Sequence, residues 1–368
     1  MSTIINYIQK YGDKTFKEKE INEVDYAILT TLSYLNFDHI LYNNKKKVTL
    51  NDAVKSFFDF YTDKELKNHG LGLKDAYAIA KSLIDKKRYQ NLKLYNYEYI
   101  TDESIQFCAM FIDIDPNRVF ISVEGTDDEI VGWKEDFQMS YQFPIPSQRK
   151  AASYLNKHIP FFSEKNYIIS GHSKGGNLAL VGTMYMNMLK QHKIKEIYSF
   201  DGPGLRNEQL KSYRYLSVQK RFHSLIPNYS IVGLLLNNPK ESKIIKSNVK
   251  GIYAHSIYNW DIIDDKFNQV DELSKFSKNL DKAISSWLNK YDYQTRREFV
   301  EDIFNVFERC NIETLYKIHA KDIKELLLVV KESGKLSDDT KEIIKELLSS
   351  IIDVIKEDTF TIRKSKQD

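Results

Sequence analysis

The amino-acid sequence predicts an α/β fold in which a mainly parallel sheet is covered by helices on both faces. The first observation behind this prediction is an alternation of strand-like and helix-like segments in the middle of the chain. Short apolar runs at 167–169 and 194–200 flank a largely apolar helical stretch there. The second is that turn residues follow these runs, as in 201–204. Strands separated by helices favour parallel pairing, because the helix carries the chain back to the same end of the sheet.

Periodicity divides the chain into three parts. Residues 1–90 read as an N-terminal helical segment packed on the core, residues 91–270 as the α/β core, and residues 271–368 as a C-terminal helical appendage. Asn51 is expected to cap a helix of the first part. The expected helices, assigned from apolar residues at helical spacing, fall at about 26–37, 51–61, 74–87, 147–158, 174–190, 280–287, 296–307, 323–330 and 340–355.

The core is predicted to contain strands that are each stopped by a turn. Asp115, Pro116 and Asn117 form such a turn, and the runs on either side of it read as a hairpin. Later runs alternate with predicted helices and are assigned to the parallel part of the sheet. The expected strands fall at 92–97, 105–114, 118–123, 167–169, 194–200, 218–226 and 243–249.

The composition is that of a globular protein with nearly balanced charge. Among 368 residues, 42% are hydrophobic, and 54 Lys+Arg stand against 51 Asp+Glu, so the formal charge of +3 argues against nucleic acid as a partner. Cys108 and Cys310 lie far apart, which predicts neither a disulfide framework nor a zinc site. No apolar run approaches the roughly 20 residues of a membrane-spanning helix, and 1–16 lacks the apolar centre of a signal peptide. We expect a cytoplasmic protein and leave peripheral contact with lipid open.

A Gly-x-Ser-x-Gly pattern at 171–175 joins a predicted strand to a predicted helix. A serine on so tight a turn needs small neighbours two residues before and two after it, which Gly171 and Gly175 supply. The turn lifts the hydroxyl of Ser173 clear of the sheet, beside backbone N–H groups that stabilise negative charge. The pattern predicts a nucleophilic serine in an α/β-hydrolase fold. The alternative is a Gly-rich turn with an accidental serine; the spacing of a phosphate-binding loop is absent.

An activated serine needs a base, and the chain order in this fold is serine, acid, histidine. Four histidines follow Ser173, namely His192, His223, His255 and His319. His192 ends the elbow helix, His223 falls within a predicted strand, and His319 belongs to the helical tail. His255 comes from a loop just after the last predicted core strand, so it is the favoured base.

The acid and the oxyanion donors come from strand ends. Asp201 follows the strand after the elbow helix, where its carboxylate can orient an imidazole; alternatively, it bonds the N–H groups of its own Gly-Pro turn. The backbone N–H of Lys174, directly after the nucleophile, is one expected oxyanion donor. Thr126, which follows Gly125, is the other, although this segment also reads as a simple turn with an Asp cap.

Four stretches together resemble a bacterial family of lipase-like α/β-hydrolases of unknown function, described as Mbeg-like and related to the class 3, fungal-type lipases. These stretches are 124–137, 171–179, 200–204 and 226–233, and the similarity extends over about 25–261. The resemblance implies a Ser173 nucleophile, an oxyanion contribution from Thr126 and a base at His255.

Three residues depart from the family pattern. Glu124 stands where arginine is usual, Asn228 lies about where class 3 lipases carry their acid, and Ser256 follows the histidine where an acidic residue is expected. Asp201 would then serve as the acid, an arrangement known in pancreatic-type lipases. These departures also keep a catalytically inactive relative among the alternatives.

The sequence therefore predicts a serine hydrolase that cleaves a small-molecule or lipid ester or thioester through an acyl-enzyme. An apolar run at 231–236, after a strand end, suggests an apolar acyl group, although ordinary core is the competing interpretation. No metal or organic cofactor is required. The alternatives are an inactive hydrolase fold used for binding or as a scaffold, and an acyltransferase that uses the same acyl-enzyme.

Overall fold

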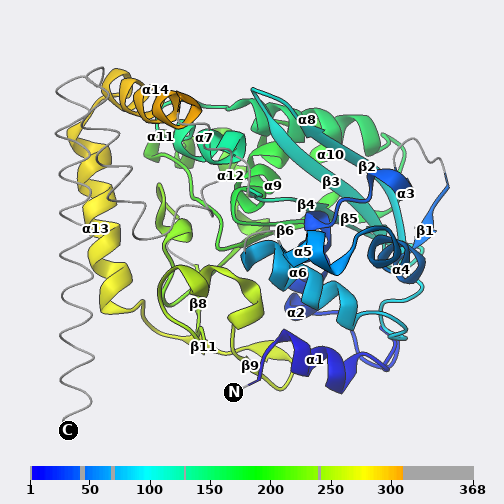
Figure 1. Ribbon diagram of the computed structural model, residues 1–368. Helices are drawn as coiled ribbons and strands as arrows, with labels where there is room; N and C mark the ends of the chain where they lie inside the picture. The colour runs from blue at the N-terminus through cyan, green and yellow to red at the C-terminus, as the bar shows by residue number, and fades with distance from the viewer. Residues whose placement is uncertain (1, 42–45, 68–70, 128–129, 239–241, 310–368) are drawn as a thin grey trace, which may run out of the picture.

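The computed structural model describes residues 2–41, 46–67, 71–127, 130–238 and 242–309. Within this part, a central sheet lies between two groups of helices (Figure 1). The predicted helices at 323–330 and 340–355, together with Cys310 and His319, lie outside the described residues.

The described strands form one large mixed sheet and one small hairpin. In the large sheet the strand order is β1-β2-β3-β4-β5-β6-β7-β8-β11, and β9 pairs with β10 separately. The strands are β1 (Val48–Thr49), β2 (Lys93–Thr101), β3 (Gln106–Asp113), β4 (Arg118–Val123), β5 (Asn166–His172), β6 (Ile194–Phe200), β7 (Phe222–Pro227), β8 (Lys243–Ile245), β9 (Ile262–Ile263), β10 (Lys266–Phe267) and β11 (Gln269–Val270).

The prediction of a mainly parallel sheet holds only for its centre. Strands β4 to β8 run parallel, with helices or long connections between them, whereas β1, β2, β3 and β11 pair antiparallel with their neighbours. The reason is connection length. The short turns between β2, β3 and β4 can join only antiparallel strands, because a parallel pair needs a crossover of a dozen residues or more.

Alternation along the strands assigns each apolar side chain to one of two cores. On β4, Phe120 packs into the cluster shared with the N-terminal helices, whereas Val119 and Ile121 pack into the cluster shared with α8 and α9. Neighbouring side chains of a strand point to opposite faces, so a sheet buried on both sides reads as a continuous apolar run. Figure 1 shows α8 and α9 on one side of the sheet and α1, α2 and α6 on the other.

The helices occur both before the large sheet and between and after its strands. Those of the first 90 residues are α1 (Ile4–Tyr11), α2 (Glu23–Thr31), α3 (Asp38–Leu41), α4 (Leu50–Phe60), α5 (Asp63–Lys67) and α6 (Leu71–Ser82). The later ones are α7 (Ile130–Gln138), α8 (Pro146–His158), α9 (Lys174–Tyr185), α10 (Met188–Gln191), α11 (Asn207–Leu210), α12 (Tyr213–Leu216), α13 (Lys275–Lys290) and α14 (Tyr293–Arg309).

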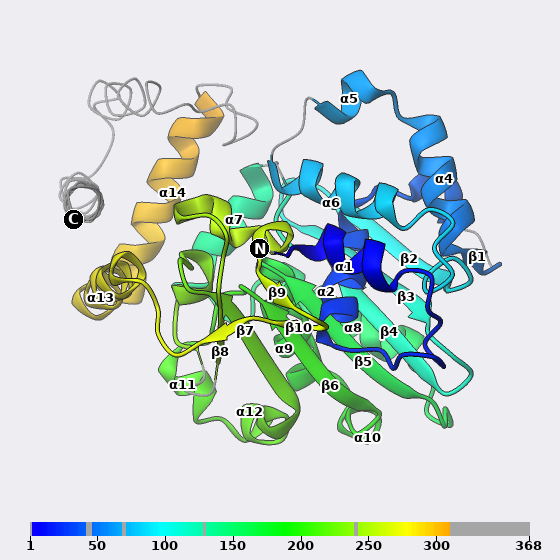
Figure 2. The ribbon, with the colours of Figure 1, turned by 90° about the horizontal axis from the view of Figure 1, so that it is seen from below.

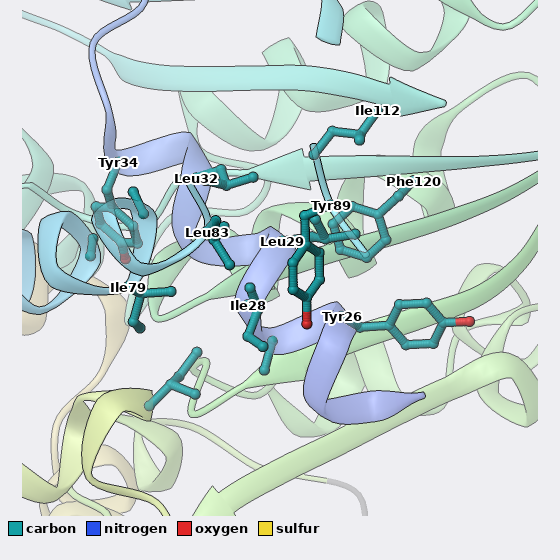
Figure 3. Close-up of a cluster of buried hydrophobic side chains, with 14 of the residues drawn as sticks. Tyr26, Ile28, Leu29, Leu32, Tyr34, Ile79, Leu83, Tyr89, Ile112 and Phe120 are labelled. Carbon is teal, nitrogen blue, oxygen red and sulfur yellow. The ribbon is translucent and has the colours of Figure 1, made fainter. Parts of the chain in front are cut away.

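Helix α2 is the central packing element of the N-terminal helices. Figure 3 shows Ile28, Leu29 and Leu32, at and just beyond its end, among side chains from the sheet and from the α6 region. The helix begins at a capping box in which Asn22 accepts the N–H groups of Val24 and Asp25. Because this helix is buried on nearly all sides, it fixes the N-terminal helices to the sheet. Figure 2, turned by 90°, shows α1, α2 and α6 over that face.

A buried ion pair joins α2 to the segment before β2. The guanidinium of Arg88 donates to both carboxylate oxygens of Asp25, at 2.7 and 2.5 Å, and both side chains are 0% exposed. The hydroxyls of Tyr7 and Tyr89 also donate to Asp25, at 3.1 and 2.7 Å. The remaining guanidinium hydrogens reach backbone carbonyls between Lys14 and Glu20. The pair is therefore fully hydrogen-bonded, as a buried pair must be.

Several predicted boundaries were wrong, and for three of them the structure shows the reason. The helix expected at 174–190 ends at Tyr185, because Met186 is extended and Asn187 caps a new helix through the N–H of Leu189. The strand expected from 218 begins only at Phe222, after a 3₁₀ turn. Thr49, rather than Asn51, caps α4 by accepting the N–H of Asp52.

The described part of the C-terminal region packs against α7. The rings of Phe137 and Phe304 lie 5.8 Å apart, and Lys134 pairs with Glu308 at 3.9 Å. Both α13 and α14 lie to one side of the sheet in both views (Figures 1 and 2). None of the helices in the described residues has the length and the apolar character needed to cross a membrane.

Candidate active site

Ser173 occupies the turn between β5 and α9, in a backbone conformation that side chains rarely adopt. Its φ and ψ are 57° and −136°, and the residue is 6% exposed. The positions two residues before and after it have room only for glycine. A Cβ on Gly171 would lie 2.0 Å from the carbonyl carbon of Gly175, and one on Gly175 would lie 2.3 Å from the carbonyl oxygen of Val123. Strained backbone of this kind costs about 1–3 kcal/mol and concentrates at functional sites.

Asp201 and His255, far apart in sequence, are joined by a short hydrogen bond. Asp201 directly follows β6 with φ of 50° and is fully buried, and its Oδ2 lies 2.6 Å from Nδ1 of His255. Its Oδ1 accepts the hydroxyl of Ser230 at 2.5 Å and the N–H of Gly233 at 3.1 Å. A carboxylate only accepts, so Nδ1 of His255 carries the proton and Nε2 is left as the basic nitrogen.

Ser173 and His255 line the same pocket, which measures ≈ 50 Å³. In the described part of the chain, no hydrogen bond joins the Ser173 hydroxyl to the His255 ring. Such bonds are often long without substrate and shorten when it binds. The lining residues are Thr31, Tyr34, Leu73, Asp75, Ala76, Ile79, Thr126, Asp127, Trp133, His172, Ser173, His255, Ser256, Ile257 and Tyr258.

The loop after β4 lies directly against the elbow. A Cβ on Gly125 would be 2.4 Å from the carbonyl oxygen of His172 and 2.9 Å from Cβ of Ser173, so only glycine permits this approach. The hydroxyl of Thr126 donates to Oδ2 of Asp136 at 2.5 Å, so its hydrogen points to that carboxylate. The N–H of Lys174 is the first of helix α9 and has no partner within the helix.

The side chain of Lys174 is buried in a chain of polar contacts that no sequence pattern predicts. Its Nζ pairs with Glu135 at 3.2 Å and donates to Oε1 of Gln106. The amide Nε2 of Gln106 donates in turn to Glu124 at 3.2 Å. Glu124, which replaces the usual arginine, is thus linked to Lys174 through Gln106, and these contacts tie β3 and α7 to the elbow.

His172, the residue before the nucleophile, holds the backbone of His255. Its Nε2 lies 2.8 Å from the carbonyl oxygen of His255, and its Nδ1 lies 2.8 Å from the hydroxyl of Tyr34. Because a carbonyl oxygen only accepts, Nε2 carries the proton and Nδ1 accepts from Tyr34. Burial, together with the adjacent His255, keeps the pKa of His172 well below its ordinary value. The ring is therefore neutral at physiological pH.

The two other departures from the family pattern have structural partners. Ser256 donates its hydroxyl to Asp75 of α6, and burial raises the pKa of that carboxyl. The carboxyl of Asp75, on a helix far away in the sequence, therefore contacts the residue that follows His255. Asn228 accepts the N–H of Ser247 at 2.9 Å. Asn228 is absent from the described lining of the pocket.

The remaining predictions fall away from the pocket. His223 stacks on Tyr198 at 4.7 Å, and His192 follows α10 at the surface. The apolar run 231–236 contributes none of the described lining residues; its Gly233 instead bonds Asp201. Asp136, Gln106, Glu135 and Ser230 were missed, because no sequence signal marks a polar residue whose partner lies ten or more positions away.

Comparisons with known proteins place the chain in a family. No curated protein matches the chain. A structure described as the crystal structure of M37 lipase is similar over 59% of this chain and 70% of its own, with 15% sequence identity and a TM-score of 0.37. The model of the Mbeg1-like family matches residues 83–305, which is more than half of the sequence. The chain therefore belongs to the Mbeg1-like family.

Proposed function

We propose that this protein is a serine hydrolase of the α/β-hydrolase fold that cleaves a carboxylic ester or thioester. The observation that carries the proposal is the 2.6 Å bond from His255 to the buried carboxylate of Asp201, beside a pocket that also contains the strained Ser173. A buried carboxylate that holds one imidazole nitrogen leaves the other to take a proton from a hydroxyl. A structural turn needs none of these features.

In the proposed reaction, Ser173 Oγ attacks the carbonyl carbon while Nε2 of His255 takes the hydroxyl proton. The negative oxygen of the tetrahedral intermediate faces the N–H groups of Lys174 and Thr126. The intermediate collapses to an acyl-enzyme, and the leaving alcohol or thiol receives the proton from His255. Water then attacks the acyl-enzyme by the same steps, which releases the acid and restores the serine.

The size of the pocket favours a short apolar acyl group. Leu73, Ala76 and Ile79 of the α6 region supply apolar lining. A volume of ≈ 50 Å³ has room for on the order of four water molecules. An acetyl or butyryl group fits such a space without movement of the helices, whereas a long chain does not.

The test is hydrolysis of p-nitrophenyl esters of increasing acyl length by the wild type and by Ser173→Ala, His255→Ala and Asp201→Asn. We expect acetyl and butyryl esters to react faster than octanoyl esters. We also expect kcat to fall by roughly 10⁴-fold or more for the first two variants and about 10³–10⁴-fold for the third. His192→Ala, an exposed histidine outside the pocket, is the matched control and should retain the wild-type rate.

Equal rates in the wild type and the three variants would remove the proposed mechanism. Labelling by a fluorophosphonate probe is an independent test of Ser173, because the probe modifies only an activated serine. A folded wild-type protein that the probe does not label at Ser173 would instead be an inactive member of this fold that binds a ligand or partner.

A further inference from the structure

Large apolar side chains from three neighbouring segments are exposed on the surface. The segments are the loop before β5, helix α10 and helix α12. Phe162 is 98% exposed and Leu189 is 71% exposed. Exposed apolar side chains that gather in one place mark a surface that binds a partner or a membrane. We name this group the apolar patch; its members are Phe161, Phe162, Met188, Leu189, Tyr213 and Leu216.

Polar contacts hold the three segments of the apolar patch side by side. Nζ of Lys190, in α10, lies 4.3 Å from the ring centre of Phe161 and donates to the carbonyl oxygen of Asn156 at 2.6 Å. The hydroxyl of Ser217, directly after α12, donates to Oε1 of Gln191 in α10 at 3.2 Å. Figure 2 shows α10 and α12 along one edge of the molecule. The exposed side chains therefore belong to one surface.

The apolar patch and Ser173 lie at opposite ends of the elements that connect them. Helix α9 begins directly after Ser173 and ends at Tyr185, shortly before α10. Its 12 residues span about 18 Å at 1.5 Å per residue. Strand β5 likewise follows the loop that carries Phe162 and ends next to Ser173. A partner bound at the patch is therefore remote from the pocket.

Positive charge surrounds the apolar patch, although the chain as a whole is nearly balanced. The segments 187–195 and 211–221 include α10 and α12, and they contain neither Asp nor Glu. The loop before β5 adds a single acid, Glu164. The charge of this surface is therefore strongly positive. Its seven cations are Lys190, Lys193, Lys195, Lys211, Arg214, Lys220 and Arg221.

The fixed cations of this surface have neutral partners. Lys193 donates to the carbonyl oxygen of Ser163, and Arg214 donates to that of Met184 at 3.1 Å. Arg221 donates to two further backbone carbonyls, at 2.9 and 2.5 Å. Within the described residues, none of the seven cations forms an ion pair with a carboxylate. A carbonyl fixes a cation without cancelling its charge, so the positive field of this surface extends into the solvent.

The combination of exposed apolar side chains with unbalanced cations fits an anionic lipid bilayer. Aromatic and aliphatic side chains enter the boundary between headgroups and acyl chains, while the Lys and Arg around them attract anionic headgroups. Protein interfaces, by contrast, are depleted of Lys. Single-stranded nucleic acid would stack on phenylalanine rings but would leave Met188, Leu189 and Leu216 without a partner.

We infer that the apolar patch and the cations around it dock this protein on the surface of an anionic membrane. The inference goes beyond the proposed function and needs no reaction at Ser173. Because the patch lies at the far end of α9, docking directs the pocket away from the bilayer. The docked protein then meets substrates from the water phase, which agrees with a pocket suited to short acyl groups.

Co-sedimentation of the full chain with vesicles tests the docking. The vesicles consist of phosphatidylcholine alone or of phosphatidylcholine with anionic phosphatidylglycerol. We expect the wild type to bind the anionic vesicles about 10-fold or more tightly than the neutral ones. Phe162→Ala combined with Leu189→Ala, and Lys195→Glu combined with Lys220→Glu, should each weaken this binding by about 10-fold or more. All four side chains are exposed, so these substitutions leave the core intact.

Two further variants serve as controls. Phe60→Ala combined with Ile263→Ala removes side chains that are 60% and 57% exposed, but in α4 and β9, and should bind the vesicles as the wild type does. Ser173→Ala should also bind as the wild type does, because docking requires no catalysis. Failure of the proposed hydrolase and failure of the docking are therefore distinguishable.

Fluorescence gives a reading at the patch itself. Phe162→Trp places an indole at the most exposed apolar position, and its emission should shift to shorter wavelength with anionic vesicles, relative to the wild type under the same conditions. Absence of vesicle binding, or binding that the Phe162 and Leu189 substitutions leave unchanged, would overturn the inference. A dimer that these substitutions convert to a monomer, or single-stranded RNA bound more tightly than the vesicles, would assign the surface to another partner and overturn it as well.

Discussion

At the scale of single residues, the environment of Asp201 fits the acid of the proposed triad better than it fits a turn aspartate. A turn aspartate bonds N–H groups of its own turn. The carboxylate of Asp201 instead accepts from Ser230, Gly233 and His255, which lie 29 to 54 positions away. A Cβ on Gly233 would lie 2.3 Å from Oδ1 of Asp201, so glycine is needed there for the carboxylate to keep its place.

Asp136 gives a prediction on pH dependence. Burial raises its pKa from 3.8 to about 6, against the lowering effects of Lys174, Thr126 and His255, while Glu135 raises it further. Between these values the folded state keeps a proton that the unfolded state releases, so the free energy of unfolding falls as pH rises from about 4 to 6. Above about pH 6, Asp136 is ionised in both states, and its effect on the free energy of unfolding no longer changes with pH.

We therefore expect Asp136→Asn to unfold with a flatter pH profile than the wild type. Urea unfolding at pH 4, 5, 6 and 7 measures this, and the difference between the two profiles isolates Asp136 from other titrating groups. The variant should gain stability relative to the wild type as pH rises through the window. Parallel profiles would show that the carboxyl titrates normally.

At the scale of elements, the β5–α9 elbow combines a strained residue with close-packed glycines. The strain at Ser173 comes from its Cβ, so replacing it with glycine should release it. A positive φ of this kind destabilises the folded state of a non-glycine residue by about 1–3 kcal/mol. Glycine avoids this strain but makes the unfolded chain more flexible, which lowers the free energy of unfolding by about 0.4–1 kcal/mol. The release of strain is the larger effect.

Ser173→Gly should therefore be more stable than Ser173→Ala by about 1 kcal/mol. Both variants lack the hydroxyl, so the comparison removes its hydrogen bonding, and chemical denaturation of the two proteins measures the difference. At a position with ordinary helical φ the order would be reversed, because glycine there costs about 0.5–1 kcal/mol relative to alanine. Finding that reversed order here would mean that the elbow is not strained in solution.

At the scale of the whole molecule, the pocket depends on the attachment of the N-terminal helices. Tyr34, Leu73, Ala76 and Ile79 belong to that segment, and they line the pocket together with Ser173. The buried pair of Asp25 and Arg88 fixes the same segment. Stability and activity should therefore depend together on this pair.

Arg88→Ala should lower the free energy of unfolding by about 3–5 kcal/mol, because it leaves a buried carboxylate unpaired. Arg118→Ala is the matched control: Arg118 pairs with Asp115 at 2.7 Å while about a third of both side chains is exposed. A pair of that kind contributes about 0–1 kcal/mol. Guanidinium unfolding of both variants measures the contrast, and similar losses would argue against a fixing role for the buried pair.

The sequence by itself determined the order of elements and the elbow. Apolar periodicity located most helices and strands, because burial on one or two faces leaves a repeat of 3.6 or 2 residues in the chain. The Gly-x-Ser-x-Gly spacing could be recognised in the sequence because a tight turn restricts the size of residues that are close to one another along the chain. Periodicity does not locate element ends: Asn187 caps a new helix, and this local cap competes with continuation of the helix before it.

Only the tertiary structure decided which distant residues meet. The bond between Asp201 and His255, and the hydrogen bonds that link Glu124 to Lys174 through Gln106, each join segments that are far apart in the sequence. The mixed character of the sheet likewise followed from how its edge strands pair. Local sequence records the conformation of a segment, because that conformation depends on near neighbours; it does not record which partner satisfies a buried polar group, because that depends on where the whole chain brings its elements together.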